Sequence, residues 1–237
     1  MNRELRANYI FHIIVDAGEI VNGFSYILTG LGRGYHFVSG TFNTPITVHD
    51  CFYTRFWPIS LILGTEIPAW MTILVSTERI IAVHKPALYN RMFSSNMKMM
   101  LIGVAGSCIM ASLTWAALSA LTPAAFHDST STQHCAIISS TSKAFSTFHF
   151  VFVPFAYFAS FVSLCTIAYF HRKTSRNVTK SGKKGPMLSI FIATTAFDVI
   201  LCSAPSIVMI SASWQLFKPN DIIVSITYAT TGFVSGF

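Results

Sequence analysis

Residues 78–89 read ERIIAVHKPALY, in which an acidic and a basic residue end a long apolar segment. The apolar run before this pair has about 20 residues, the length that a helix needs to cross a bilayer core. A Glu–Arg ion pair at the end of a spanning helix can lie at the level of the lipid headgroups. Pro86 then ends the helix, because proline lacks the backbone donor and disfavours a helical residue before it. We therefore expect residues 78–89 to lie where a spanning helix leaves the membrane.

The composition also indicates a membrane protein. The chain is 52% hydrophobic and only 11% charged, whereas soluble domains average about 25% charged residues. Windows of about 20 mostly apolar residues occur at 8–31, 56–80, 98–122, 146–170 and 187–211, with a shorter one at 222–237. We expect an all-α, multi-pass transmembrane helix bundle that forms a single transmembrane domain over residues 1–237.

The distribution of Lys and Arg predicts the orientation, because short cytoplasmic loops hold the excess of these residues. On the expected topology 12 of the 16 Lys and Arg residues lie on one side. The exceptions are Arg33, Arg55, Lys143 and Lys218. The N-terminus of the chain is therefore expected to be cytoplasmic. The net charge of +7 follows from this topology and does not indicate binding to nucleic acid.

The spacing Glu-Arg-x-x-Ala-Val-x-x-Pro-x-x-Tyr over residues 78–89 resembles the end of the third transmembrane helix and the second cytoplasmic loop of rhodopsin-like G-protein-coupled receptors. Those receptors usually have Asp-Arg-Tyr, and here Ile80 takes the third position. This departure is common in the serpentine chemoreceptors of nematodes, and the Ser-Thr-Glu-Arg sequence at 76–79 is also similar to them, in particular to the Srg-type superfamily with its Srv members. The resemblance implies a plasma-membrane chemosensory receptor that transmits binding of an extracellular small molecule to a heterotrimeric G protein.

The resemblance also numbers the apolar segments. If 56–80 corresponds to the third receptor helix, then 8–31 is the second, and the next three segments are the fourth to sixth. Residue 222 would open the seventh. We therefore expect a seven-helix receptor type with the first helix missing and the seventh incomplete, as in a truncated gene model or partial chain. A signal peptide is the alternative for 8–31, although Asp16 and Glu19 lie inside it.

G-protein coupling and switching are assigned by the resemblance to Glu78, Arg79, Pro86, Tyr89 and Pro205. Arg79 would be held by Glu78 at rest and released toward the G protein on activation. Residues 202–205, Cys-Ser-Ala-Pro, resemble the Cys-Trp-x-Pro of the sixth receptor helix, with serine in place of the switch tryptophan. The basic residues between 171 and 184 suit anionic lipid heads and, by resemblance, the G protein. Topology alone would produce the same charges.

The resemblance further implies a disulfide between Cys51 and Cys135 on the outer, oxidising side of the membrane. Two free thiols are the alternative. Cys51 precedes Arg79 by 28 residues, which is about 42 Å of continuous helix and matches a bilayer with its headgroups. We therefore expect Cys51 at the outer end of the helix whose inner end carries Arg79.

Ionisable residues inside spanning segments are costly, which makes each one a functional candidate. Asp16 and Glu19 are three residues apart and share one side of their helix. Asp198 lies seven residues before Pro205, on the same face. We expect these three carboxyl groups to form an intramembrane polar network. The alternative is that each is protonated or paired with a neighbouring helix.

The segment 56–80 provides the expected wall of a ligand pocket. Residues on the same stripe as Arg79 include Leu61, Thr65, Ala69 and Thr72. Hydroxyl groups that bond only to their own backbone are the alternative for the threonines. Glu66 lies 13 residues before Arg79, about 220° around the helix. We therefore expect Glu66 to face the fourth or fifth receptor helix.

The sequence contains no pattern typical of an enzyme or a metal site. The eight histidines are scattered, without His-x-x-x-His or Cys-x-x-Cys pairing. We expect no catalytic residue, cofactor or metal. The expected partners are a heterotrimeric G protein, a small-molecule ligand and membrane lipids, and not nucleic acid. A multi-pass transporter or a non-functional receptor gene fragment is the alternative to a signalling receptor.

Overall fold

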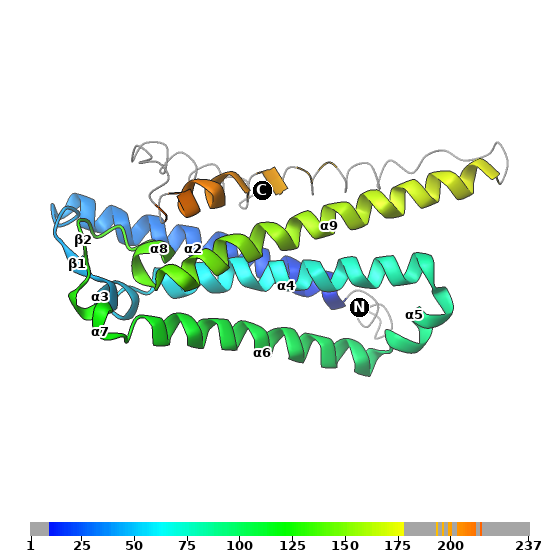
Figure 1. Ribbon diagram of the computed structural model, residues 1–237, viewed down its shortest axis with the longest axis horizontal. Helices are drawn as coiled ribbons and strands as arrows, with labels where there is room; N and C mark the ends of the chain where they lie inside the picture. The colour runs from blue at the N-terminus through cyan, green and yellow to red at the C-terminus, as the bar shows by residue number, and fades with distance from the viewer. Residues whose placement is uncertain are drawn as a thin grey trace.

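A computed structural model describes residues 10–177 and, further along the chain, residues 193, 196, 199–200, 203–211 and 214. Four helices in the described part contain segments that are long and apolar enough to cross a membrane. They are α2 (Ile10–Val38), α4 (Trp57–His84), α6 (Ser95–Ser119) and α9 (Lys143–Asn177), the last over Lys143–Phe170. Figure 1 shows that these helices run alongside one another, with α4 between α6 and α9.

Short elements occupy the two ends of the bundle (Figure 1). One end has α5 (Pro86–Met92), and we call it the α5 end. The other end, which we call the cap, is formed by β1 (Ile46–Thr47), α3 (Val48–Tyr53), α7 (Pro123–His127), β2 (Ser129–Thr130) and α8 (Ile137–Ser140). The strands pair antiparallel, with Ile46 opposite Thr130 and Thr47 opposite Ser129. This pairing joins the segments before α4 and before α9.

The structure confirms a mostly helical membrane protein, because four of the six expected segments coincide with these long helices. The segment 187–211 lies only partly within the described residues, and 222–237 lies outside them. Helix α2 runs to Val38 instead of 31, because Arg33 lowers the hydropathy of the sequence without breaking the helix. Gly40, with a φ of 72°, follows its end. Glycine tolerates this left-handed conformation, which commonly closes a helix.

The expectation that Cys51 and Arg79 share one helix is wrong. Cys51 lies on α3, which ends at Tyr53, and α4 begins separately at Trp57. Pro58 is in the first turn of α4. Its ring nitrogen has no hydrogen to donate to the carbonyl four residues earlier, at Thr54, so a continuous helix would lose a bond there. Thr47 caps the new helix α3, and its hydroxyl accepts a hydrogen bond from the Asp50 backbone.

Helices α2 and α4 approach each other closely through glycines. A Cβ added to Gly64 would lie 2.8 Å from Asn22 Cα and 2.8 Å from Ser25 Oγ. A Cβ on Gly18 would lie 3.0 Å from Ile67 Cγ2. Apolar side chains gain little by leaving lipid for protein, so helix association in a bilayer depends on such close backbone packing. The glycines therefore fix the position of α2 against the central helix.

The outward faces of the helices are apolar. Exposed large side chains include Ile20, Phe24 and Leu31 of α2 and Phe155 and Phe158 of α9. A soluble monomer rarely exposes apolar patches of this extent. The arrangement is the one expected of helices that present these faces to lipid.

Replacing Gly64 with alanine is expected to destabilise the bundle by about 1–3 kcal/mol, the usual range for overpacking. The new methyl group would meet the backbone of α2, which cannot move as a side chain can. Thermal unfolding of the purified chain in detergent measures the effect. The matched control is Gly103→Ala on α6, because the added Cβ would meet no described atom within 4 Å apart from the adjoining backbone of its own helix. Equal stability of the two variants would contradict the close contact.

Candidate functional site

A buried ion pair ties α4 to α6 near the α5 end. The Lys98 ammonium lies 2.7 Å from Glu78 Oε1, and the two side chains are only 3% and 8% exposed. Glu78 is in the last two turns of α4, and Lys98 is in the first turn of α6. Two buried charges of this kind must satisfy each other, since loss of either would leave the other uncompensated in a medium of low dielectric constant.

Tyr89 of α5 completes this site. Its hydroxyl donates a hydrogen bond to Glu78 Oε1 at 3.1 Å. Burial, and next the Glu78 carboxylate, raise the pKa of Tyr89, so the phenol keeps its proton. Tyr89 stacks on Phe93, whose ring meets Phe11 of α2 edge to face. Lys98 Nζ lies 5.6 Å from the centre of the Phe11 ring, within range of a cation–π contact.

Phe11, Glu78, Tyr89, Phe93 and Lys98 are called the Glu78 cluster below. They come from α2, α4, α5, α6 and the residue that follows α5. The cluster thus brings together two residues that the sequence proposed, Glu78 and Tyr89, and adds Lys98. In the sequence, Lys98 served only as one of the positive charges that predict the orientation in the membrane. Its position at the start of an apolar segment could have marked it as the partner of a buried carboxylate.

Arg79 points to a different helix from Glu78. One of its terminal nitrogens, Nη2, lies 2.7 Å from Nε2 of His12 on α2. Arginine has only donors, so it donates and His12 Nε2 accepts. The sequence predicted Glu78 as the partner that holds Arg79, and it did not predict His12.

The two proline predictions have different outcomes. Helix α4 ends at His84, and Pro86 is the first residue of α5, as predicted from the missing donor of proline. Pro205 is buried within the described helical residues 203–211. Its role as a pivot stays a prediction.

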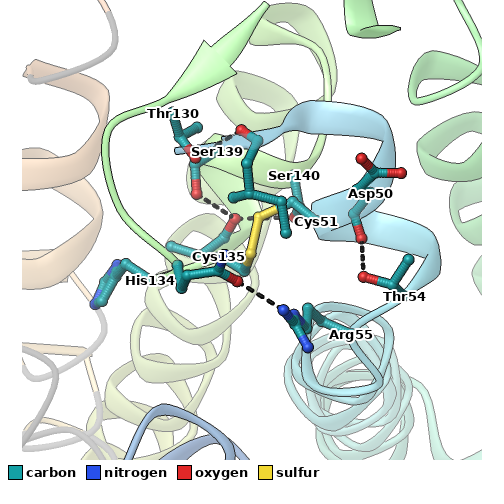
Figure 2. The surroundings of a disulfide bond; sticks show 12 residues. Asp50, Cys51, Thr54, Arg55, Thr130, His134, Cys135, Ser139 and Ser140 are labelled. Carbon is teal, nitrogen blue, oxygen red and sulfur yellow. Dashed lines mark hydrogen bonds between the residues drawn. A yellow bond between two sulfur atoms is a disulfide. The ribbon is translucent and has the colours of Figure 1, made fainter. Parts of the chain in front are cut away.

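The disulfide between Cys51 and Cys135 is present, with the two Cα atoms 5.4 Å apart. Both cysteines are fully buried. Figure 2 shows the bridge between α3 and the segment that carries His134 and Cys135. The covalent link that the receptor resemblance implied is therefore confirmed.

Three side chains hold the segment 133–135, one each from α2, from the start of α4 and from the residues between α3 and α4. Trp57 Nε1 donates to the Cys135 carbonyl at 3.0 Å, and Arg33 Nε donates to the His134 carbonyl at 2.8 Å. Arg55 Nη2 donates to Gln133 Oε1 at 2.7 Å. Cys135, at the end of this segment, has a left-handed conformation with a φ of 42°. The cap is thus bound to α2 and α4 by polar contacts as well as by the disulfide.

The predicted network of Asp16, Glu19 and Asp198 is placed only in part. Glu19 accepts a hydrogen bond at 3.1 Å from the hydroxyl of Tyr157, on α9. Asp16 is exposed on α2, and Asp198 lies outside the described residues. The structure thus joins Glu19 to α9, and the network of three carboxyl groups stays a prediction.

A second buried polar group, the Glu66 cluster, consists of Thr65, Glu66, Ser112 and His149. The Ser112 hydroxyl donates to Glu66 Oε1 at 2.7 Å, and His149 Nδ1 lies 3.1 Å from the same oxygen. His149 Nε2 lies 3.1 Å from Thr65 Oγ1. Ser112 is on α6 and His149 is on α9. The prediction that Glu66 faces the segment 98–122 or the segment 146–170 is confirmed, since it contacts both α6 and α9.

The residues of the expected pocket wall lie in packed surroundings. Leu61 and Ala69 are buried in the core, and Thr65 donates to the Leu61 carbonyl at 2.8 Å. The Thr72 carbonyl accepts from the Ser76 hydroxyl, whose oxygen also lies 2.8 Å from Ser160 Oγ on α9. Thr65 thus bonds to its own backbone, as in the alternative, but it also contacts His149 on α9. Ligand contact by these four residues stays a prediction.

No protein-family model matches the chain, and neither does any curated protein. Among the described residues, no group of three or more His, Cys, Asp or Glu side chains could hold a metal ion. The class that the fold and these sites define is a multi-pass α-helical membrane protein with a disulfide-linked cap and two buried polar clusters.

Replacing Lys98 with methionine is expected to destabilise the bundle by about 3–5 kcal/mol, because the Glu78 carboxylate loses its buried cation. Methionine keeps a similar length and volume, so the change removes mainly the charge. Unfolding in detergent measures the effect. Lys85→Met, at an exposed lysine of the same end, is the control and should have little effect. Adding Glu78→Gln to Lys98→Met should recover part of the loss, and failure to do so would contradict the charge argument.

Acid is expected to weaken the cap through His134. Burial, and next the positive charge of Arg33, lower the pKa of His134 to about 3, whereas an unfolded histidine titrates near about 6.5. Between these two pKa values, the unfolded chain therefore binds a proton at His134 that the folded chain does not bind. The free energy of unfolding therefore decreases as the pH falls through this range. The loss is about 2 kcal/mol at about pH 5.

The measurement compares unfolding free energies at neutral pH and at about pH 5 for the wild type and His134→Ala. The variant should lack this part of the pH dependence. His127→Ala, at an exposed histidine of the same cap, should retain it. The same acid loss in all three proteins would contradict the role of His134.

Proposed function

We propose that the chain is a G-protein-coupled chemosensory receptor of the plasma membrane, which transmits binding of an extracellular small molecule to a heterotrimeric G protein. The observation that carries this proposal is the contact between Tyr89 and Glu78 at the end of α4. The sequence spacing from which the resemblance arose therefore corresponds to a physical contact. The seven-helix architecture and the nematode Srg-type assignment belong to the same proposal.

The cap supports the proposed orientation. A disulfide is typical of an oxidising compartment, which supports a cap outside the cell and an α5 end in the cytoplasm. The positive-inside rule favours the same orientation. Basic residues near the α5 end are Arg79, Lys85 and Lys98, together with Arg172, Lys173 and Arg176 in the last turns of α9. Lys98 is buried against Glu78, so of the first three residues the exposed Lys85 is the charge that would face anionic lipid headgroups and the G protein.

In the proposed mechanism a ligand shifts an equilibrium between two helix packings, through its different affinity for each. The Glu78 cluster holds α2, α4, α5 and α6 together in the packing described here. Arg79 is held on α2 by His12. Separation of α2 from α4 at this end would free Arg79 to meet the G protein.

A transporter is the second candidate, favoured by the Glu66 cluster. Ionisable residues buried among three spanning helices also mark the ion paths of transporters. Uptake of a radiolabelled solute into liposomes, without a G protein, would support this candidate.

Replacing Arg79 with alanine is expected to abolish coupling while the protein still reaches the surface. The measurement is nucleotide exchange on purified Gα subunits, with the chain in nanodiscs and a panel of small organic compounds as candidate ligands. For any compound that stimulates exchange, the variant should reduce the response by about tenfold or more, equivalent to about 1.4 kcal/mol of coupling.

The control is Lys85→Ala, which removes an exposed positive charge from the same end. It should retain most of the response. Full exchange by Arg79→Ala would overturn the role of Arg79. Solute flux without any stimulated exchange would favour the transporter.

A further inference from the structure

Two arginines at the cap end of the bundle run against the general distribution of charge. Only four of the 16 Lys and Arg residues are expected on the outer side of the membrane, and Arg33 and Arg55 are two of them. Arg33 Nε donates to the His134 carbonyl. Arg55 Nη2 donates to Gln133 Oε1, and Figure 2 shows its guanidinium turned toward this segment of the cap. Two positive charges thus meet at one short segment where the positive-inside rule predicts few.

Arg55 has only neutral partners among the described residues. Its half-buried side chain donates to the Gln133 amide and lies 5.9 Å from the centre of the Trp57 ring. No carboxylate of the described residues forms an ion pair with it. Its Nε atom is buried and has no hydrogen-bond partner in the described part. A guanidinium is always charged, so a buried donor without an acceptor indicates a partner that the chain itself does not provide.

The surroundings of Arg55 hold its guanidinium in place without neutralising it. Gln133 is 8% exposed, and its Nε2 donates to Thr44 Oγ1 at 2.8 Å. The amide oxygen is therefore the atom that faces Arg55. The neighbouring His134 is uncharged at neutral pH, because burial, and next the positive charge of Arg33, lower its pKa to about 3. The segment 133–135 thus offers positive and neutral groups to an approaching anion.

We propose that Arg55 and Arg33 form an anion-binding site of the cap, and that its ligand is the carboxylate of a small organic acid. The planar fork of donors in arginine matches the two oxygens of a carboxylate. Both Arg55 and the exposed Phe56 contact the Trp57 ring, so the apolar body of the same molecule has an aromatic surface near the charge. The site assigns a chemical class to the extracellular ligand, and in that respect it rests on the proposed function.

The anion site differs from the pocket wall that the sequence predicts on α4. Arg55 precedes the first residue of α4, whereas Arg33 belongs to α2. The segment that both arginines contact is itself fixed by the disulfide and by the bond from Trp57 Nε1 to the Cys135 carbonyl. Such a fixed site loses little entropy when a ligand binds. An anion held there acts on the junction of α2, α4 and the cap.

The test is thermal unfolding of the full chain in micelles of dodecyl maltoside, an uncharged detergent, with sodium butyrate as the probe. Butyramide has the same carbon skeleton without the charge, and sodium chloride gives the same ionic strength. Butyrate should raise the unfolding midpoint by about 5 °C or more when its concentration is about 100 times its dissociation constant. The two control compounds should not. Equal effects of butyrate and butyramide, or of butyrate and chloride, would overturn the proposal.

Arg55→Gln removes the charge and keeps an amide that can donate to Gln133. This variant should lose the shift that is specific to butyrate. Lys143→Gln is the matched control, because it makes the same change at an exposed cation at the start of α9. The control should respond to butyrate as the wild type does. An unchanged butyrate shift in Arg55→Gln would show that Arg55 only supports the cap, and would overturn the site.

Gln133→Glu keeps the proposal testable if Arg55→Gln does not fold. It places a carboxylate where the amide oxygen lies 2.7 Å from Arg55 Nη2. The Thr44 hydroxyl, which donates to the Thr41 carbonyl, can turn toward the second oxygen of the new side chain. This internal carboxylate should raise the unfolding midpoint in chloride and remove the response to butyrate. A full butyrate response in Gln133→Glu would overturn the site.

Two further results separate the source of the anion from the fate of the receptor proposal. A shift caused by added dioleoylphosphatidylcholine and abolished by Arg55→Gln, without any shift from butyrate, would overturn the carboxylate in favour of a lipid phosphate. The unfolding assay contains no G protein. Butyrate binding without stimulated nucleotide exchange would therefore support the site and contradict the receptor proposal alone. Exchange stimulated by uncharged compounds, without a butyrate shift, would contradict the anion site alone.

Discussion

The packing of α4 against α2, α6 and α9 is the constraint on which the other features depend. In a bilayer the burial of apolar surface gives helices little reason to associate, so close backbone contact and polar bonds must hold them. Helix α4 provides both. Gly64 allows the backbone of α2 to approach closely. Glu66 contacts α6 and α9 through hydrogen bonds, and Glu78 forms an ion pair with Lys98 of α6. A substitution on α4 is therefore expected to alter its packing against several helices at once.

Hydropathy, proline positions and helical periodicity predicted the features of the structure that depend only on residues near one another in the sequence. Hydropathy located the four long helices, and Pro86 located the end of α4. Helical periodicity gave the direction of Glu66. The break between α3 and α4 was also encoded locally, by Pro58, but the bilayer-length spacing from Cys51 to Arg79 favoured one continuous helix.

The partners of the buried charges could not be predicted in the same way. Lys98 and His12 lie on helices whose rotation and depth relative to α4 depend on tertiary packing. His149 looked like one of eight scattered histidines, because a single residue in an apolar segment has no spacing pattern. The disulfide was predicted from family resemblance, and the bonds of Trp57, Arg33 and Arg55 that support it became visible only in three dimensions.

The bridge between Cys51 and Cys135 has a topological consequence. It joins residues 84 positions apart, and α4, α5 and α6 all lie between them. The chain therefore contains a covalent ring that runs along the bundle through α4, reverses direction at α5 and returns through α6. A single break in the backbone anywhere inside this ring would leave the two pieces of the protein as one molecule, and only a reductant would release them.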